Sequence, residues 1–164
     1  MTSSHIVRNA GKPMPEHTCG QPEHDEVTDY LLLRTVNSRE GLINLMSEAE
    51  AFFHERGLDE RTIYISNLVL EEVLTNVIKY AYDDEGSHEI SVELTLDPRH
   101  VQIVFEDDGR EFDPLSVPTP ALNGPITDCE PGGLGIHLVR KLSSSMDYSR
   151  TGGVNRLTIR LARK

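Results

Sequence analysis

The chain has 164 residues and a net charge of −11, from 27 acidic and 16 basic side chains. This length suits one domain, which buries roughly 68–70% of the surface of its unfolded chain and so has a sizeable core. The acidic balance argues against nucleic acid as the main partner, because a broad basic surface is needed to neutralise phosphates. It does not exclude one bound nucleotide, which needs only local donors and a metal.

The sequence shows no apolar run near the ~18 residues of a membrane span, and its first residues lack the apolar core of a signal peptide. Its two cysteines, Cys19 and Cys129, stand in polar, Pro- and Gly-rich surroundings, which do not indicate a disulfide framework. We therefore expect a cytoplasmic protein with reduced thiols and no membrane contact.

Residues 1–28 are polar and irregular, with several prolines and glycines and few apolar side chains. This composition is typical of a flexible N-terminal extension, which we expect to precede a domain at 29–164. Three histidines and Cys19 fall in the extension, but their spacing matches no standard zinc pattern.

Beyond the extension, apolar periodicity and turn residues predict a series of helices and strands. In chain order these are a strand at 30–36, helices at 39–56 and 60–81, strands at 89–96 and 101–107, a helix at 134–142, and strands at 146–150 and 154–161. Five of the nine prolines lie between 113 and 131, which predicts a long loop there. This order favours an α/β fold, a two-layer α/β sandwich with helices on one face of a mixed, mostly antiparallel sheet.

The helix expected at 60–81 carries the first group of polar candidates. Glu72 and Asn76 are four residues apart, so they share one helical face, mostly among Leu, Val and Ile. A carboxylate can take a proton or polarise a water, and a side-chain amide oxygen is a hard ligand suited to Mg²⁺. Because Glu and Asn on a helix are usually only solvated, the pair alone does not establish a site.

The second group, Asp107-Asp108-Gly109, stands at the end of an expected strand. A carboxylate there can hold a ligand donor such as an exocyclic amine, and the glycine lets the ligand approach the backbone closely. The alternative interpretation is an ordinary Asp-Gly turn.

The third group is a glycine-rich stretch at 132–135, just ahead of a helix. Its backbone N–H groups and the positive end of the helix dipole can together cradle phosphate oxygens. It is not a Walker loop, because no Gly-Lys-Ser/Thr follows it.

In this order, the three groups resemble the three boxes of the GHKL (Bergerat-fold) ATPases, which share a histidine-kinase-like ATPase domain. Glu72 and Asn76 match the N box, Asp107-x-Gly109 followed by Phe-Asp-Pro matches the first glycine box, and Gly-Gly-Leu-Gly-Ile at 132–136 matches the second. Within that superfamily, the chain most resembles the bacterial anti-sigma-factor serine kinases, the RsbW-like group.

The resemblance implies a role for each matching residue. Glu72 would be the general base that accepts a proton from a substrate serine, and Asn76 would ligate the Mg²⁺ that bridges the ATP phosphates. Asp107 would bind the adenine amino group, and Gly109 would let the base lie close. Three residues would line the phosphate end of the site: Gly133, Leu134 and Gly135.

Other parts of the resemblance are less regular. Thr158 matches a position that often supports the adenine-binding aspartate, and residues 113–131 would form the ATP lid. Glu111 stands where the first glycine box usually has a second glycine, and Tyr80 stands where relatives often have histidine. These two departures remove no residue with an implied role, but they bear on nucleotide affinity and on whether kinase activity is retained.

The resemblance implies an ATP-dependent protein-serine kinase of the partner-switching type. It would sequester a sigma factor or other output protein in one state, and bind and phosphorylate a small antagonist (anti-anti-sigma) protein on serine in the other. The family also implies a homodimer that makes no direct contact with nucleic acid. The alternative is a non-catalytic module that uses ATP only as a conformational ligand while it sequesters a regulatory partner.

Overall fold

The computed structural model describes residues 7–8, 29–118 and 133–163. In chain order its elements are β1 (Val7–Arg8), β2 (Asp29–Val36), α1 (Arg39–Glu55), α2 (Glu60–Tyr80), β3 (Glu89–Leu96), β4 (His100–Asp107), α3 (Gly133–Leu142), β5 (Ser145–Thr151) and β6 (Val154–Ala162). The predicted helices and strands from residue 29 onward all occur, with bounds that differ from the expected ones by at most one residue.

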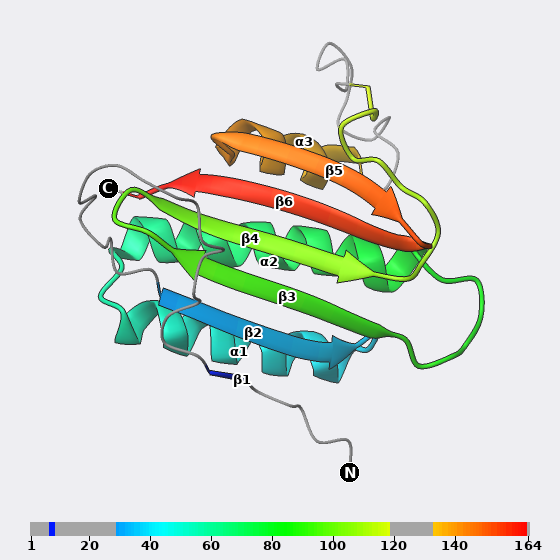
Figure 1. Cartoon of the computed structure of the whole chain (residues 1–164), viewed down its shortest axis with the longest axis horizontal. Helices are drawn as coiled ribbons and strands as arrows, with labels where there is room; N and C mark the ends of the chain where they lie inside the picture. Colours follow the sequence, from blue (N-terminus) through cyan, green and yellow to red (C-terminus); the bar gives the residue numbers. More distant parts are fainter. Residues whose placement is uncertain (1–6, 9–28, 119–132, 164) are drawn as a thin grey trace, which may run out of the picture.

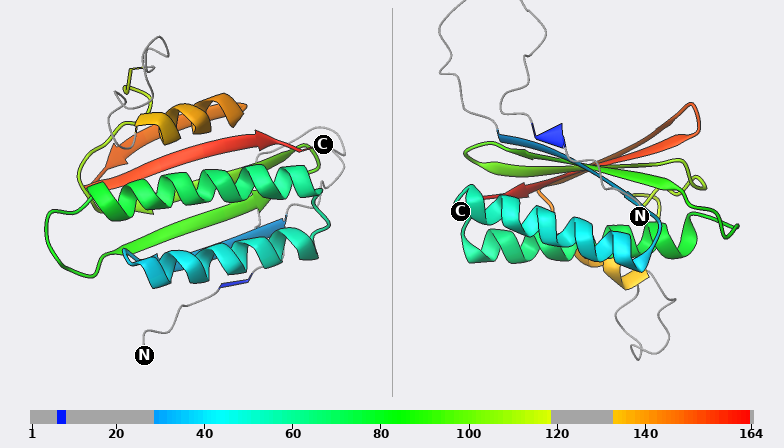
Figure 2. Two further views of the ribbon diagram at one scale, coloured as in Figure 1. Left: turned by 180° about the vertical axis from the view of Figure 1, so that it is seen from behind. Right: turned by 90° about the horizontal axis from the view of Figure 1, so that it is seen from below.

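The strands form one six-stranded sheet in the order β1-β2-β3-β4-β6-β5, and each of its five pairings is antiparallel. Figure 1 shows the strands in this order, and the two views of Figure 2 show the three helices on one face of the sheet. The predicted two-layer α/β sandwich is therefore confirmed, but the sheet expected to be mixed is antiparallel at every pairing in the described ranges.

The short strand β1 lies within the stretch expected to be a flexible extension. Its two residues pair with the edge of β2, Val7 opposite Leu32 and Arg8 opposite Leu31. These two residues are therefore not irregular, because the free backbone groups of an edge strand offer a place for an added strand. The rest of the expected extension lies outside the described residues.

Side-chain caps and a glycine set the bounds of the two long helices. Ser38 Oγ accepts a hydrogen bond from Gly41 N (3.0 Å) at the start of α1, and Gly57 adopts φ 65° just beyond its end. Asp59 caps α2 by accepting from the backbone of Arg61 and Thr62. None of the helices in the described ranges is long and apolar enough to cross a membrane.

The core lies between the helices and the sheet, and it is built from alternate strand residues and one face of each long helix. Phe53 of α1 and Leu70 and Leu74 of α2 are fully buried against inward-facing strand residues such as Ile103 and Ile159. The opposite face of the sheet carries charged side chains instead, including the ion pair between Arg156 and Glu106. This alternation has the period of two that a half-buried sheet requires.

The last strand, β6, lies between β4 and β5 although β5 precedes it in the chain. The β5–β6 hairpin turns at Gly152 and Gly153, whose φ values of 61° and 87° suit a two-residue hairpin loop. The resulting register sets Asn155 opposite Asp107 on one side and opposite Arg150 on the other. Three polar residues from three strands therefore form one row across the sheet.

Truncating the core should destabilise the fold strongly. Phe53→Ala is expected to lower the free energy of unfolding by about 3–5 kcal/mol, because it leaves a cavity between α1 and the sheet. Ile43→Ala, on the same helix but 58% exposed, should change it by less than about 0.5 kcal/mol. Urea unfolding of both variants tests the packing; equal effects would contradict it.

Candidate functional site

A cavity of about 540 Å³ opens beside the C-terminal half of α2, in the size range of small-molecule sites. It lies among α2, α3, the loop after β4, and strands β4, β5 and β6. Its walls are mostly apolar, from Val73, Val77, Phe105, Ile136 and Leu157. Polar side chains enter it at only a few points, so each of them can orient a ligand.

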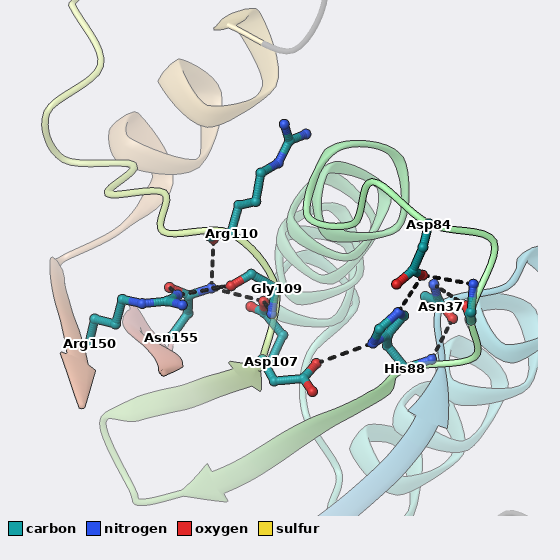
Figure 3. Close-up of polar contacts among 10 residues, drawn as sticks. Asn37, Asp84, His88, Asp107, Gly109, Arg110, Arg150 and Asn155 are labelled. Carbon is teal, nitrogen blue, oxygen red and sulfur yellow. Dashed lines mark hydrogen bonds and ion pairs between the residues drawn. The ribbon is translucent and has the colours of Figure 1, made fainter. Parts of the chain in front are cut away.

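Asp107, at the end of β4, is the most buried ionisable side chain that lines the cavity, with 8% of its surface exposed. Its Oδ1 accepts hydrogen bonds from Gly109 N and from Asn155 Nδ2, each at 2.9 Å (Figure 3). Its Oδ2 accepts none from the described residues. Burial raises the pKa of the Asp107 carboxyl above its ordinary value, although the two hydrogen bonds act in the opposite direction. The carboxylate therefore offers one free acceptor oxygen at the cavity.

Asn155 is a site residue that the sequence analysis missed. It is 6% exposed and occupies an inward-facing position of β6, followed by Leu157 and Ile159 on the same face. A short polar amide in that apolar row was a usable signal, because a buried amide needs hydrogen-bond partners and asparagine is uncommon in strands.

Thr158 does not have the position expected of it. It lies opposite Val104 and faces away from the helices, whereas Asn155 lies opposite Asp107. Residues 155 and 158 are an odd number of positions apart, so the pleat of the strand turns them to opposite faces. Support of Asp107 therefore comes from Asn155 and not from Thr158.

The loop after Asp107 is held against the end of α2. Arg110 N donates to Ala81 O at 2.8 Å, and the Arg110 guanidinium donates to Tyr80 O at 2.6 Å. A Cβ on Gly109 would lie 2.5 Å from the Ala81 Cβ. The packing of the loop against α2 therefore requires glycine at this position, whether or not a ligand also lies against it.

Asp108 points the other way and joins the loop that follows α2. Its carboxylate lies 3.6 Å from His88 Nδ1. His88 Nε2 lies 2.8 Å from Asp84 Oδ1 (Figure 3). The hydrogen bond with Asp84 raises the pKa of His88 above its ordinary value. Asp107 and Asp108 thus have separate surroundings, and Asp107 is the one that lines the cavity.

Asn76 and Glu72 lie on the same side of α2, one turn apart. Asn76 lines the cavity, and its Nδ2 is buried without a hydrogen-bond partner among the described residues. Glu72 is half-buried and lies beside α3, where a Cβ on Gly135 would approach Glu72 Oε2 to 2.0 Å. The expected pair on one helical face is therefore present, but only Asn76 lines the cavity.

The glycine-rich stretch begins α3. Gly133 is the first residue of the helix, Leu134 is 46% exposed, and Ile136 reaches the cavity wall. The first N–H groups of a helix have no partner within it, so they are free to bind an anion. Gly132 lies outside the described residues.

Part of the expected lid is attached to α3. Arg140 donates to Val117 O at 2.6 Å and also to Pro114 O, and both of these loop residues line the cavity. Arg140 is therefore not simply solvated at the surface, because two backbone carbonyls bind its guanidinium. Residues 119–131 of the expected lid lie outside the described residues.

The two departures from the family pattern, Tyr80 and Glu111, both line the cavity. Tyr80 is 45% exposed. The Glu111 side chain makes no ion pair with the residues that the structure describes, and Arg110 forms its ion pair with Asp83 instead (3.1 Å). An unneutralised carboxylate therefore stands close to the expected nucleotide.

These residues fit ATP and Mg²⁺ chemically. The apolar walls suit a purine ring, and the free oxygen of Asp107 suits an exocyclic amine. The Asn76 side chain makes no hydrogen bond with the described residues, so its amide oxygen, a hard ligand, is available to a cation. No group of three or more His, Cys, Asp or Glu that could hold a metal ion by itself occurs in the described ranges. A Mg²⁺ ion here would take its other ligands from phosphate oxygens and water, as this ion usually does.

Comparison with known proteins agrees with this geometry. Residues 36–161 match the model of the histidine kinase-like ATPase domain, so the chain belongs to this family. It is similar to the serine/threonine-protein kinase BtrW of Bordetella bronchiseptica (31% identical over 101 residues, 60% of this chain and 70% of the relative). It is also similar to the serine-protein kinase RsbW of Staphylococcus epidermidis (27% over 145 residues, 83% and 89%). The predicted resemblance to RsbW-like GHKL ATPases is confirmed.

A solved structure of the RsbU and RsbW domains of a Mycobacterium tuberculosis protein shares the fold, with a TM-score of 0.56 and 14% identity. The match covers 82% of this chain and 33% of that longer chain. At this identity, the likeness concerns the fold alone.

Replacing the Asp107 carboxylate should weaken ATP binding without lowering the stability of the fold. Asp107→Asn is expected to weaken ATP binding by about 100-fold or more, because the carboxamide would present N–H to the adenine amine. The free energy of unfolding at neutral pH should stay equal or rise, because folding raises the pKa of this acid and its charged form disfavours the native state. Any increase in the free energy of unfolding relative to the parent should disappear as the pH falls below the ordinary carboxyl pKa, because Asp107 is then protonated in both the folded and the unfolded state.

Calorimetric titration with ATP, and urea unfolding at neutral and acidic pH, measure these effects. Asp108→Asn is the matched control, since the side chain of that neighbour is 64% exposed and points away from the cavity. Unchanged ATP affinity in Asp107→Asn would show that the adenine assignment is wrong.

Proposed function

We propose that this protein is an ATP-dependent serine kinase that switches between two protein partners. The observation that carries the proposal is the convergence of Asp107 and Asn76 on one cavity, with Glu72 one helical turn away. Membership of the histidine kinase-like ATPase family and similarity to proteins named serine-protein kinases support it.

In this proposal the cavity binds ATP with the adenine at Asp107 and the phosphates toward the first turn of α3. Gly133, Leu134 and Gly135 offer backbone N–H groups there, at the positive end of the helix dipole. Asn76 holds Mg²⁺, which neutralises phosphate charge when bound. Phosphoryl transfer depends mainly on such positioning and neutralisation, so few catalytic side chains are needed.

Glu72 serves as the general base. The serine Oγ forms a bond to the γ-phosphorus, the bond to the bridging oxygen of the β-phosphate breaks, and ADP leaves while the Glu72 carboxylate takes the serine proton. Such a base must come within ~2.6–3.2 Å of the hydroxyl. The half-buried position of Glu72 beside α3, outside the cavity wall, leaves it accessible to a hydroxyl of an incoming protein.

The partners in this proposal are those of a partner switch. One is a sigma factor or other regulatory output protein that is sequestered, and the other is a small antagonist protein that is phosphorylated on serine. The protein is expected to act as a homodimer, and its net charge of −11 favours protein partners over nucleic acid.

Phosphorylation of the antagonist proteins encoded by the same genome tests the kinase. With Mg²⁺ and ATP, the parent should form phosphoserine, and Glu72→Gln should be slower by about 10²–10⁴-fold with near-normal ATP affinity. Glu71→Gln, at an exposed neighbouring position of α2, is the matched control and should be near parental. Equal rates for Glu72→Gln and the parent would exclude Glu72 as the base.

Gly135→Ala tests the placement of Glu72 in another way. The added Cβ would displace the flexible end of Glu72, while alanine keeps the backbone N–H available to phosphate. Phosphoserine formation should fall by about 10²-fold, the loss expected of a misplaced base, with ATP affinity little changed. Loss of ATP affinity instead would show that Gly135 serves the phosphates directly.

A non-catalytic module that responds to ATP is the second candidate, and Glu111 is the observation that favours it. Its carboxylate lines the cavity without a cationic partner among the described residues, which opposes the binding of a polyphosphate. Calorimetric binding of ATP and ADP, without transfer to any antagonist tested, would select this alternative. Glu111→Gly should then strengthen ATP binding without producing phosphoserine.

A further inference from the structure

Arg150 of β5 contacts two residues next to Asp107, namely Asn155 and Gly109. It is not one of the described residues that line the cavity. Its Nη1 donates to Asn155 Oδ1 at 2.5 Å and to Gly109 O at 2.9 Å (Figure 3). The contact follows from the register of the sheet, which sets Arg150 opposite Asn155 and Asn155 opposite Asp107. Arg150 is therefore linked to the carboxylate through one amide.

Hydrogen bonds fix the orientation of that amide. Asn155 Oδ1 accepts from the Arg150 guanidinium and from the Tyr148 hydroxyl (2.8 Å). Asn155 Nδ2 donates to Arg110 O and to Asp107 Oδ1, each at 2.9 Å. A guanidinium cannot accept and a carbonyl cannot donate, so only this orientation satisfies every partner.

This orientation determines what Asp107 presents to a ligand. Oδ1 is occupied by two donors, from Gly109 N and Asn155 Nδ2, and Oδ2 remains as an acceptor at the cavity. An acceptor matches the 6-amino group of adenine and repels the 6-oxo group of hypoxanthine. The cationic Arg150 also favours the charged, acceptor-only form of this carboxyl.

We propose that Arg150 is a specificity-determining positioning residue. Together with Tyr148 it holds the Asn155 amide against Asp107, so that the site accepts 6-aminopurine nucleotides and rejects 6-oxopurine nucleotides. This inference rests on the proposed nucleotide function. Without Arg150, the amide loses its donor-only partner and Asp107 loses a nearby positive charge, which weakens the acceptor.

Calorimetric titration with ATP and with inosine triphosphate tests the inference. In Arg150→Met, the ratio of ATP to inosine triphosphate affinity should fall by at least about tenfold, the effect of one lost hydrogen bond to a charged group. The Arg150→Met variant should bind ATP more weakly than the parent does, and it should bind inosine triphosphate no more weakly. Tyr148→Phe, which removes only the second donor to Oδ1, should lower the ratio less and remains informative if Arg150→Met folds poorly.

Arg156→Met is the matched control, because Arg156 pairs with Glu106 on the opposite face of the sheet and should leave the ratio unchanged. Equal losses for both nucleotides in Arg150→Met and Tyr148→Phe would overturn the inference and leave Arg150 a purely structural residue. A parent that binds neither nucleotide would instead contradict the proposed function itself.

Discussion

The pairing of β4 with β6 is the constraint on which the cavity depends, because it sets Asn155 opposite Asp107. A carboxylate buried without donors is costly, and here two donors satisfy one oxygen while the other remains available at the cavity. β6 reaches this position only because the chain first passes through α3 and β5 and then inserts between β4 and β5. Residues 107 and 155 therefore meet through the topology of the sheet.

Helix α2 links this site to the stability of the fold. Val69, Leu70, Val73 and Leu74 on its inner side are buried in the core, so this part of the helix is anchored by packing. Glu72 and Asn76 project at the edge of the same packed surface, one beside α3 and one into the cavity. A helix anchored in this way can hold polar groups in fixed positions without a ligand, which is the preorganisation that transition-state stabilisation requires.

Two polar side chains of the cavity wall lie in surroundings that are costly for a polar group. Asn76 has a buried amide nitrogen without a partner among the described residues, and burial raises the pKa of Asp107. Folded proteins pair nearly all of their buried polar groups, so such exceptions mark places where a ligand or a partner is expected. Other buried polar atoms without a partner among the described residues occur elsewhere, as at Ser66, and Asn76 is the one of them that lines the cavity.

By itself, the sequence determined the order and bounds of the helices and strands from residue 29 onward and the shared helical face of Glu72 and Asn76. These features depend on periodicity, caps and turns within a few residues, all of which can be read locally. Only the tertiary structure decided that Asn155 and not Thr158 supports Asp107, that Arg150 orients Asn155, and that Arg140 binds the loop carbonyls. These contacts depend on strand register, strand order and the direction in which each side chain leaves its element. The alternation of apolar residues indicates the face on which a strand residue lies. Which residues of two distant strands stand opposite each other depends on the strand order, which local patterns do not specify.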